Sequence, residues 1–176
     1  MDIIDEIFKV CAKHNVKPTK HCIFVKIAKQ KLYLFKEKSL VKECHVSTSR
    51  NPPSCREGSL GTPWGLHKID GKIGGGLPLD TVFRARKPDG LLSEQTDEEK
   101  KKNLILGRIM RLRGLESGLN SGGEFDTYSR FVYIHGTNQE DKIGTPNSHG
   151  CILLESQNLK KIFDEIEDGS IVYIEK

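Results

Sequence analysis

The 176-residue chain contains no long apolar run. No segment approaches the roughly 20 consecutive apolar residues of a membrane-spanning helix. The acidic start, residues 1–6, also lacks the basic and apolar parts of a secretory leader. We therefore expect no membrane insertion. The chain is then either cytoplasmic or begins after a leader that has been removed.

The chain also has little excess of charge of one sign. Its 28 lysines and arginines against 24 aspartates and glutamates give a formal net charge of +4, and the basic residues are scattered. This excess is too small to predict a nucleic-acid partner, although it suits an acidic polymer as substrate. The densest basic run, residues 100–102, directly follows an acidic run at residues 97–99, which is typical of a solvated surface segment.

The five cysteines include no Cys-x-x-Cys pair, and an odd number cannot all pair within one chain. At least one thiol is therefore free. Cys11, Cys22, Cys44 and Cys55 could form disulfides in an oxidising compartment, but their spacing does not demand it. We expect them to be buried single thiols. Cys151 is set apart because a serine, a histidine and a glycine precede it directly.

The pattern of apolar residues predicts a mainly β fold with short helices. Residues 1–20 form a helical appendage, with apolar positions at helical spacing over residues 2–14, and residues 21–176 form the main domain. A second helix is predicted over residues 159–166. The predicted strands cover residues 23–27, 31–35, 41–48, 64–69, 104–112, 130–134 and 171–174.

Turn-forming residues separate these elements. Residues 49–63 are predicted to form a long loop, and residues 86–103, which are charged and contain Pro88 and Gly90, an inserted surface loop. Residues 71–76 hold four glycines. They lack the Lys-Ser/Thr of a phosphate-binding loop and the spacing of a dinucleotide fingerprint. This segment therefore predicts a hairpin or a flexible loop.

Two short segments carry the candidate chemistry. His135 and Gly136 directly follow the predicted strand over residues 130–134, and Cys151 ends the run Ser-His-Gly-Cys at residues 148–151. A thiol that performs acyl transfer needs a base to form the thiolate and a group that orients this base. It also needs backbone N–H donors for the developing oxyanion. The two segments contain candidates for all three.

His135 is the candidate base, because a residue just past a strand end lies on the rim of the sheet. A carbonyl in the Gly136 turn could accept a hydrogen bond from its second ring nitrogen. Gly150 lets the backbone bend and turn its amides toward a ligand. The apolar residues after Cys151 lead toward a helix, and a helix N-terminus nearby would lower the pKa of the thiol.

Two other interpretations of these residues stay open. Histidine and cysteine in an apolar stretch are often plain core or surface residues. His135, His149 and Cys151 could also form a zinc site. However, no fourth ligand lies nearby in the sequence, and a His-x-Cys pair does not match common zinc spacings.

With its two motifs at this distance, the sequence resembles the catalytic domain of the L,D-transpeptidases of bacterial cell-wall synthesis. That family has a His-Gly pair, a spacer, and then Ser-x-Gly-Cys followed by an aliphatic residue. Here these are residues 135–136 and 148–152. Residues 61–69 resemble the family's Thr-Pro-x-Gly strand, and residues 111–116 and 126–130 resemble its middle segment. The resemblance covers residues 21–176.

The resemblance implies a fold and a reaction. The fold is a β-sandwich of mixed sheets with a cleft under a lid, for which residues 70–103 are the candidate. Cys151 attacks the diamino-acid carbonyl of a peptidoglycan tetrapeptide stem, D-alanine leaves, and a thioester forms. An amine from a second stem then closes a 3→3 cross-link. No metal and no organic cofactor is implied.

The resemblance also assigns roles to residues of the two motifs. His135 is the base, the Gly136 carbonyl orients it, and amides near Gly150 and Cys151 form the oxyanion hole. Two flanking residues shape the site and bind substrate, namely Ser148 and His149.

One departure concerns the position two residues after the nucleophile. The family usually has arginine there, where it helps to order the site and meets a substrate carboxylate, whereas this chain has Leu153. One hypothesis is that an arginine from a family-like segment supplies this charge and binds substrate. The candidates are Arg111, Arg113 and Arg130.

Three functions are therefore open. The domain is a transpeptidase, an L,D-carboxypeptidase that uses water as acceptor, or a domain that binds peptidoglycan without turnover. The family acts in the cell envelope or periplasm, whereas the missing leader leaves the cytoplasm open. The expected partners are peptidoglycan peptide stems, with no nucleic acid, and the expected state is a monomer.

Overall fold

The computed structural model describes residues 2–176 and confirms a mainly β fold with short helices. The helices are α1 (Ile3–Lys13), α2 (Asp97–Lys100) and α3 (Ser156–Glu165). The strands are β1 (His21–Lys26), β2 (Lys31–Lys36), β3 (Ser39–His45), β4 (Gly65–Ile73), β5 (Thr81–Arg84), β6 (Lys87–Leu91), β7 (Ile105–Gly114), β8 (Tyr133–Thr137), β9 (Ile152–Leu154) and β10 (Ile171–Glu175). Over residues 2–176, no helix is long and apolar enough to cross a membrane.

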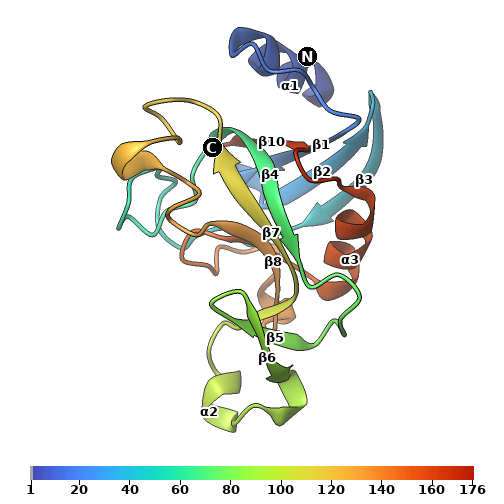
Figure 1. The fold of residues 1–176 in the computed structure, drawn as a ribbon, viewed down its shortest axis with the longest axis vertical. Coiled ribbons are helices and arrows are strands. Elements are labelled where there is room, and N and C mark those ends of the chain that lie inside the picture. Colours follow the sequence, from blue (N-terminus) through green and yellow to red (C-terminus); the bar gives the residue numbers. More distant parts are fainter. Residues whose placement is uncertain (1) are drawn as a thin grey trace.

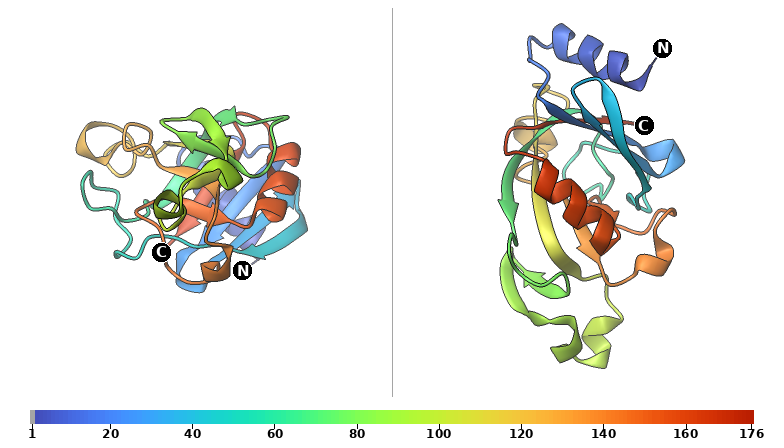
Figure 2. Two further views of the ribbon diagram at one scale, coloured as in Figure 1. Left: turned by 90° about the horizontal axis from the view of Figure 1, so that it is seen from below. Right: turned by 90° about the vertical axis from the view of Figure 1, so that its right-hand side faces the viewer.

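These strands form one mixed sheet. Its order is β3-β2-β1-β10-β4-β7-β5-β6, with β8 paired to β7 and β9 paired to β8. The pairs β1–β10 and β8–β9 are parallel, and the other pairs are antiparallel. The sheet curls, so that β1 and β2 lie across one core from β7 and β8 (Figures 1 and 2). This core also takes in the apolar face of α3.

The two faces of β1 belong to different apolar clusters. Ile23 and Val25 point into the main core with α3, whereas Cys22 and Phe24 point to the opposite face, where α1 packs. This alternation is expected of a strand, and all four side chains are fully buried. Ile7 of α1 is also fully buried in the second cluster. The helix at the N-terminus is therefore packed onto the sheet (Figure 1).

All five cysteines are free, and the four outside the motif are buried. This confirms the prediction of buried single thiols. Burial raises the pKa of each of these four thiols, so they stay protonated at neutral pH. They are Cys11, Cys22, Cys44 and Cys55.

The prediction of an inserted loop over residues 86–103 is wrong. This segment contains β6 and α2, and β6 forms a hairpin with β5 at one end of the molecule (Figure 1). The hairpin turns at Ala85 and Arg86, whose φ angles are 44° and 69°. Such turns usually carry asparagine or glycine, so the local sequence hides this hairpin.

The glycine-rich segment 71–76 is only partly a turn. β4 continues to Ile73, with a shift in its pairing to β7 between Ile69 and Lys72. Gly71, with a φ of 107°, lies at this bulge, and this backbone conformation favours glycine. The glycines therefore bend a strand before the chain turns away from it.

Candidate active site

The parallel pairing of β8 with β9, which Cys151 directly precedes, brings His135 and Cys151 to the same face of the sheet. β8 pairs with β9 through Ile134 and Ile152, whose side chains both enter the main core. Because side chains alternate along a strand, His135 and Cys151 point to the opposite face. Cys151 packs there in a small apolar cluster with Tyr133.

His135 lies inside β8 and not beyond the end of a strand, which corrects the prediction. The φ of Phe131 is 56°, a left-handed conformation that a strand does not accommodate. The strand therefore begins only at Tyr133, and the predicted strand over residues 130–134 is shifted along the chain. As a result His135 is only 4% exposed and is not on an open rim.

The Cys151 thiol opens onto a cavity of about 220 Å³. The backbone N–H of Tyr133 lies 3.4 Å from Sγ, in position to donate, and the Phe131 carbonyl lies 3.8 Å from it. Arg130, Phe131 and His149 line the same cavity. The nucleophile candidate is thus half-buried, with one side toward the cavity and the other toward protein.

Burial raises the pKa of the Cys151 thiol to about 11, while the Tyr133 N–H and the Arg130 guanidinium act in the opposite direction. The expected lowering by a helix N-terminus is not found. β9 lies between Cys151 and the first residue of α3, Ser156, so the helix dipole is not adjacent to the thiol. At neutral pH the resting side chain is therefore a protonated thiol.

The Gly136 carbonyl determines which nitrogen of His135 carries the proton. His135 Nδ1 lies 2.7 Å from this carbonyl oxygen, which can only accept a hydrogen bond. Nδ1 is therefore the protonated nitrogen, and Nε2 keeps a free lone pair. Burial lowers the pKa of His135 to about 4, so the ring is neutral at pH 7.

His135 and Cys151 are not hydrogen-bonded to each other in the part of the chain that the structure describes. A base and its nucleophile are often farther apart in a free enzyme than in its complex with substrate. The arrangement therefore supplies a neutral thiol and a neutral imidazole on one face, and proton transfer requires them to approach.

The turn before Cys151 is held by Ser148, which is itself buried. Its hydroxyl accepts a hydrogen bond from the Gly150 N–H at 3.1 Å and donates one to the Cys151 carbonyl at 2.5 Å. Gly150 has a φ of 124°, which favours glycine. Across residues 2–176 the Cys151 N–H has no hydrogen-bond acceptor, so this amide next to the thiol is free to bind an oxyanion.

Of the three arginines that sequence motifs suggested, Arg130 reaches the Cys151 cavity. The guanidinium groups of Arg111 and Arg113 instead lie 3.9 Å and 3.7 Å from the centre of the Tyr128 ring, and Arg113 also pairs with Asp70. Leu153 is 1% exposed and enters no cavity with Cys151.

Sequence reasoning missed Arg86, Phe131 and Tyr133. Tyr133 stands two residues before His135, so strand alternation could have placed it on the same face. Arg86 reaches the site from the β5–β6 turn, where its Nη1 donates to the Tyr133 hydroxyl at 3.0 Å. Its guanidinium also lies 4.8 Å from the Phe131 ring centre. No signal in the sequence connects residue 86 with this site.

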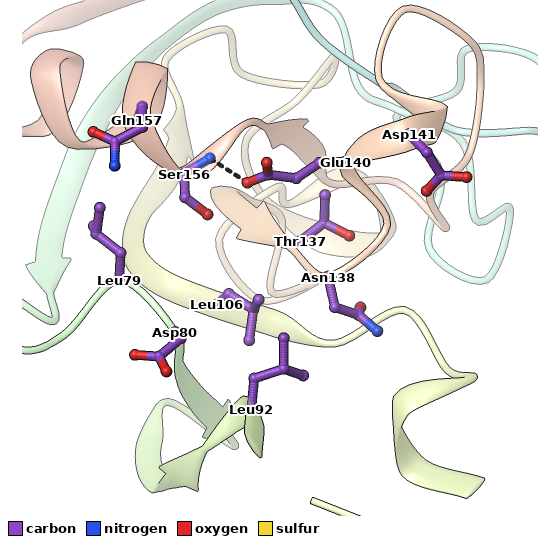
Figure 3. Close-up of a pocket in the computed structure, with 10 residues that line it drawn as sticks. All are labelled: Leu79, Asp80, Leu92, Leu106, Thr137, Asn138, Glu140, Asp141, Ser156 and Gln157. Carbon is purple, nitrogen blue, oxygen red and sulfur yellow. Dashed lines mark hydrogen bonds between the residues drawn. The ribbon is translucent and has the colours of Figure 1, made fainter. Parts of the chain in front are cut away.

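A larger cavity of about 500 Å³ lies near the other end of β8 (Figure 3). It is bordered by Thr137 and Asn138 at the end of that strand and by Ser156 at the start of α3. The Ser156 N–H donates to Glu140 at 2.7 Å across its wall. Within residues 2–176, neither Cys151 nor a histidine lines this cavity, so size alone does not identify the reactive site.

The zinc alternative has no support in this geometry. Over the described residues, 2–176, no group of three or more histidine, cysteine, aspartate or glutamate side chains is arranged to hold a metal ion. His149 is exposed, whereas His135 is buried in the sheet.

The site thus lies on a curled mixed sheet, with a histidine in β8 and a cysteine directly before the neighbouring strand β9. A family model described as the L,D-transpeptidase catalytic domain matches residues 20–174. The chain therefore belongs to the L,D-transpeptidase catalytic domain family. None of the curated proteins gives a match.

Solved structures share the fold at low sequence identity. An L,D-transpeptidase from Mycobacterium smegmatis is 14% identical, with a TM-score of 0.55, over 89% of this chain and 59% of that chain. L,D-transpeptidase 3 from Mycobacterium tuberculosis, in complex with a faropenem-derived adduct, is 15% identical, with a TM-score of 0.56, over 89% and 60%. An L,D-transpeptidase from Stackebrandtia nassauensis is 17% identical, with a TM-score of 0.55, over 91% and 57%. The chain thus spans less than two thirds of these proteins, and the likeness shows the fold.

Proposed function

We propose that the domain is a cysteine L,D-transpeptidase that acts on the peptide stems of peptidoglycan. The observation that carries the proposal is that a cavity-lining thiol, Cys151, and an imidazole in β8, His135, point to the same face of the sheet, and that Nε2 of this imidazole has a free lone pair. Membership of the family supplies the substrate class. We therefore propose that the domain acts in the cell envelope.

In the first half-reaction the Cys151 proton passes to His135 Nε2 while Sγ attacks the carbonyl of the diamino acid in a tetrapeptide stem. The oxyanion forms beside the free Cys151 N–H. The C–N bond to D-alanine then breaks, the proton leaves on its amine, and a thioester remains on Cys151. In the second half-reaction an acceptor amine attacks the thioester and gives up a proton, and the thiol is restored.

The neutral resting pair sets the order of these events. A thiol with a pKa of about 11 and an imidazole with a pKa of about 4 do not form a stable ion pair before substrate binds. Proton transfer therefore accompanies the attack. The Tyr133 N–H and the Arg130 charge stabilise the developing thiolate.

The test is turnover of a defined tetrapeptide muropeptide, followed as released D-alanine and as cross-linked dimer. We expect Cys151→Ala to abolish both products. His135→Gln should slow D-alanine release by about 10²-fold to 10⁴-fold, the range of general-base catalysis. Equal rates for the wild type and Cys151→Ala would disprove the assignment of the nucleophile.

A second candidate function is an L,D-carboxypeptidase, which Leu153 favours. Leu153 is fully buried, and its backbone bonds to Ser47, so this position presents no charge to an acceptor stem. Product analysis separates the two functions, since hydrolysis gives free tripeptide stems without dimers. A third possibility, binding without turnover, predicts that stems bind but never acylate Cys151.

A further inference from the structure

Arg130 brings a positive charge into the Cys151 cavity without a carboxylate partner. Elsewhere in the described residues, Arg56, Arg84 and Arg113 each pair with an acidic side chain. Arg130 forms no such ion pair over residues 2–176, although it lines the cavity and is half-buried. A half-buried charge without a partner is costly, so a ligand that supplies the opposite charge is favoured there.

Backbone carbonyls hold the Arg130 guanidinium in place but leave part of it free. Nη1 donates to the Ser54 carbonyl at 3.0 Å, and Nη2 donates to the Gly61 carbonyl at 2.8 Å, with Ser59 Oγ at 3.5 Å. A guanidinium has five N–H donors, and none of these contacts uses Nε. The side chain is therefore positioned by neutral oxygens, which fix its orientation without neutralising its charge.

A second guanidinium without a carboxylate partner lies next to one of the residues that line the cavity. Arg86 stacks on Phe131, a lining residue, and donates to the Tyr133 hydroxyl. It makes no ion pair with any residue from 2 to 176. Among residues 2–176 one acid lines the cavity, the exposed Glu57, which acts on the charge of Arg130 but forms no ion pair with either arginine. The cavity is thus electropositive on the side of the thiol.

We propose that Arg130, assisted by Arg86, binds a free carboxylate of the stem peptide and so makes the domain selective for stems that are not amidated at that position. This inference rests on the proposed function and specifies its substrate. A carboxylate accepts paired hydrogen bonds from a guanidinium, whereas a primary amide loses the charge and turns N–H donors toward it. The carboxylate belongs either to the terminal D-alanine or to the side chain of the diamino acid.

The test measures equilibrium binding to the Cys151→Ala protein, so that it does not depend on turnover. Three synthetic tetrapeptide stems are compared: one with both carboxylates free, one amidated at D-alanine, and one amidated on the diamino acid. We expect one of the two amides to bind about tenfold to a hundredfold more weakly than the free acid, the size of a charged hydrogen bond. Which amide loses affinity identifies the carboxylate.

Arginine variants then test whether Arg130 binds this carboxylate. Arg130→Gln, made in the same background, should weaken binding of the free acid to the level of the amide and leave the amide unchanged. Arg130→Lys should retain part of the preference for the free acid. Arg86→Gln should reduce this preference while the contacts of Arg130 with the loop over residues 49–63 stay in place. Arg56→Gln, which alters an exposed ion pair, is the matched control.

The outcomes are distinct from those of the turnover assay. Equal binding of all three stems by the Cys151→Ala protein overturns the inference. The inference is also overturned if Arg130→Gln loses affinity equally for the free acid and the amide, because this result indicates a purely structural role for the guanidinium. Selective binding without any D-alanine release by the wild type would support the inference and contradict the proposed enzyme activity.

Discussion

Opposing influences act on the ionisation of the Cys151 thiol. Burial raises its pKa to about 11, whereas the Tyr133 N–H and the Arg130 guanidinium each favour the thiolate. Because His135 is neutral at pH 7, no positive imidazole offsets the burial. The reactivity of the thiol in the free protein therefore reports directly on its immediate neighbours.

We predict that alkylation of Cys151 by iodoacetamide accelerates from neutral pH to about pH 10 without a plateau, because the thiolate is the reactive form. Arg130→Gln should move the curve to higher pH, and Arg56→Gln should leave it in place. Mass spectrometry of the Cys151 peptide gives the rate. A plateau near neutral pH would show that a stable thiolate exists at rest.

The contact between β7 and β8 requires a residue without a side chain. A Cβ on Gly136 would lie 2.6 Å from the Leu106 carbonyl of β7 and 3.2 Å from Leu159 of α3. The backbone carbonyl cannot move away without loosening the sheet pairing that carries His135. Gly136 thus keeps the strand and the helix close to the base.

Gly136→Ala should therefore destabilise the fold by about 1–3 kcal/mol, the usual cost of overpacking, and slow acylation of Cys151. The control is Gly75→Ala, where the added Cβ would lie at an ordinary 3.6 Å from Phe163 and φ is not in the left-handed region. Urea unfolding measures the stability of both variants. Equal stability of the two variants would contradict the close packing at Gly136.

Packing of α1 on the sheet makes the N-terminal helix part of the folded core. Ile7→Ala removes a fully buried side chain, and we expect a loss of about 2–5 kcal/mol in the free energy of unfolding. Val41→Ala, at a position 50% exposed on β3, should change it by less than about 0.5 kcal/mol. If Ile7→Ala is as mild as Val41→Ala, residues 1–20 are a loose appendage.

The elements that sequence predicted are those with a strong local pattern. Apolar spacing located α1 and α3, and β-rich runs located β1, β2 and β10. β9 was missed because its three residues are too short for a periodic signal. The β5–β6 hairpin was missed because Ala85 and Arg86 adopt left-handed turn conformations, which alanine and arginine do not predict.

The candidate site likewise has features that the sequence predicts and features that it does not. His135 and Cys151 stand in recognisable motifs, so their pairing could be proposed from sequence. Their burial, the neutral state of both side chains and the start of β8 at Tyr133 arise from tertiary packing, which local patterns do not contain. The approach of Arg86 depends on a hairpin distant in sequence, so only the fold reveals it.

For the whole molecule, stability should fall on both sides of neutral pH. Burial lowers the pKa of His67 and His135 from 6.5 to about 4. Between these two pH values the unfolded chain binds more protons than the folded chain. The free energy of unfolding therefore falls in acid, by about 3 kcal/mol per histidine near pH 4. The buried thiols have raised pKa values, so the unfolded chain loses protons first above about pH 9.

Urea unfolding across this pH range tests the prediction. His67 is hydrogen-bonded through both ring nitrogens, to the Gly65 carbonyl and the Thr127 hydroxyl. His67→Gln should lower stability at neutral pH but flatten its decline between about pH 6.5 and 4. An unchanged slope in this variant would show that His67 does not titrate as its burial implies.

If the proposed function is right, Cys151 accepts an acyl group from a peptidoglycan stem. The most direct measurement is mass spectrometry of the protein after brief exposure to a tetrapeptide stem, followed by peptide mapping. Our expectation is one added tripeptide acyl group, carried by Cys151 and by none of the four buried cysteines, and no adduct on Cys151→Ala. The absence of an acyl-enzyme on Cys151, or an adduct on another residue, would contradict it.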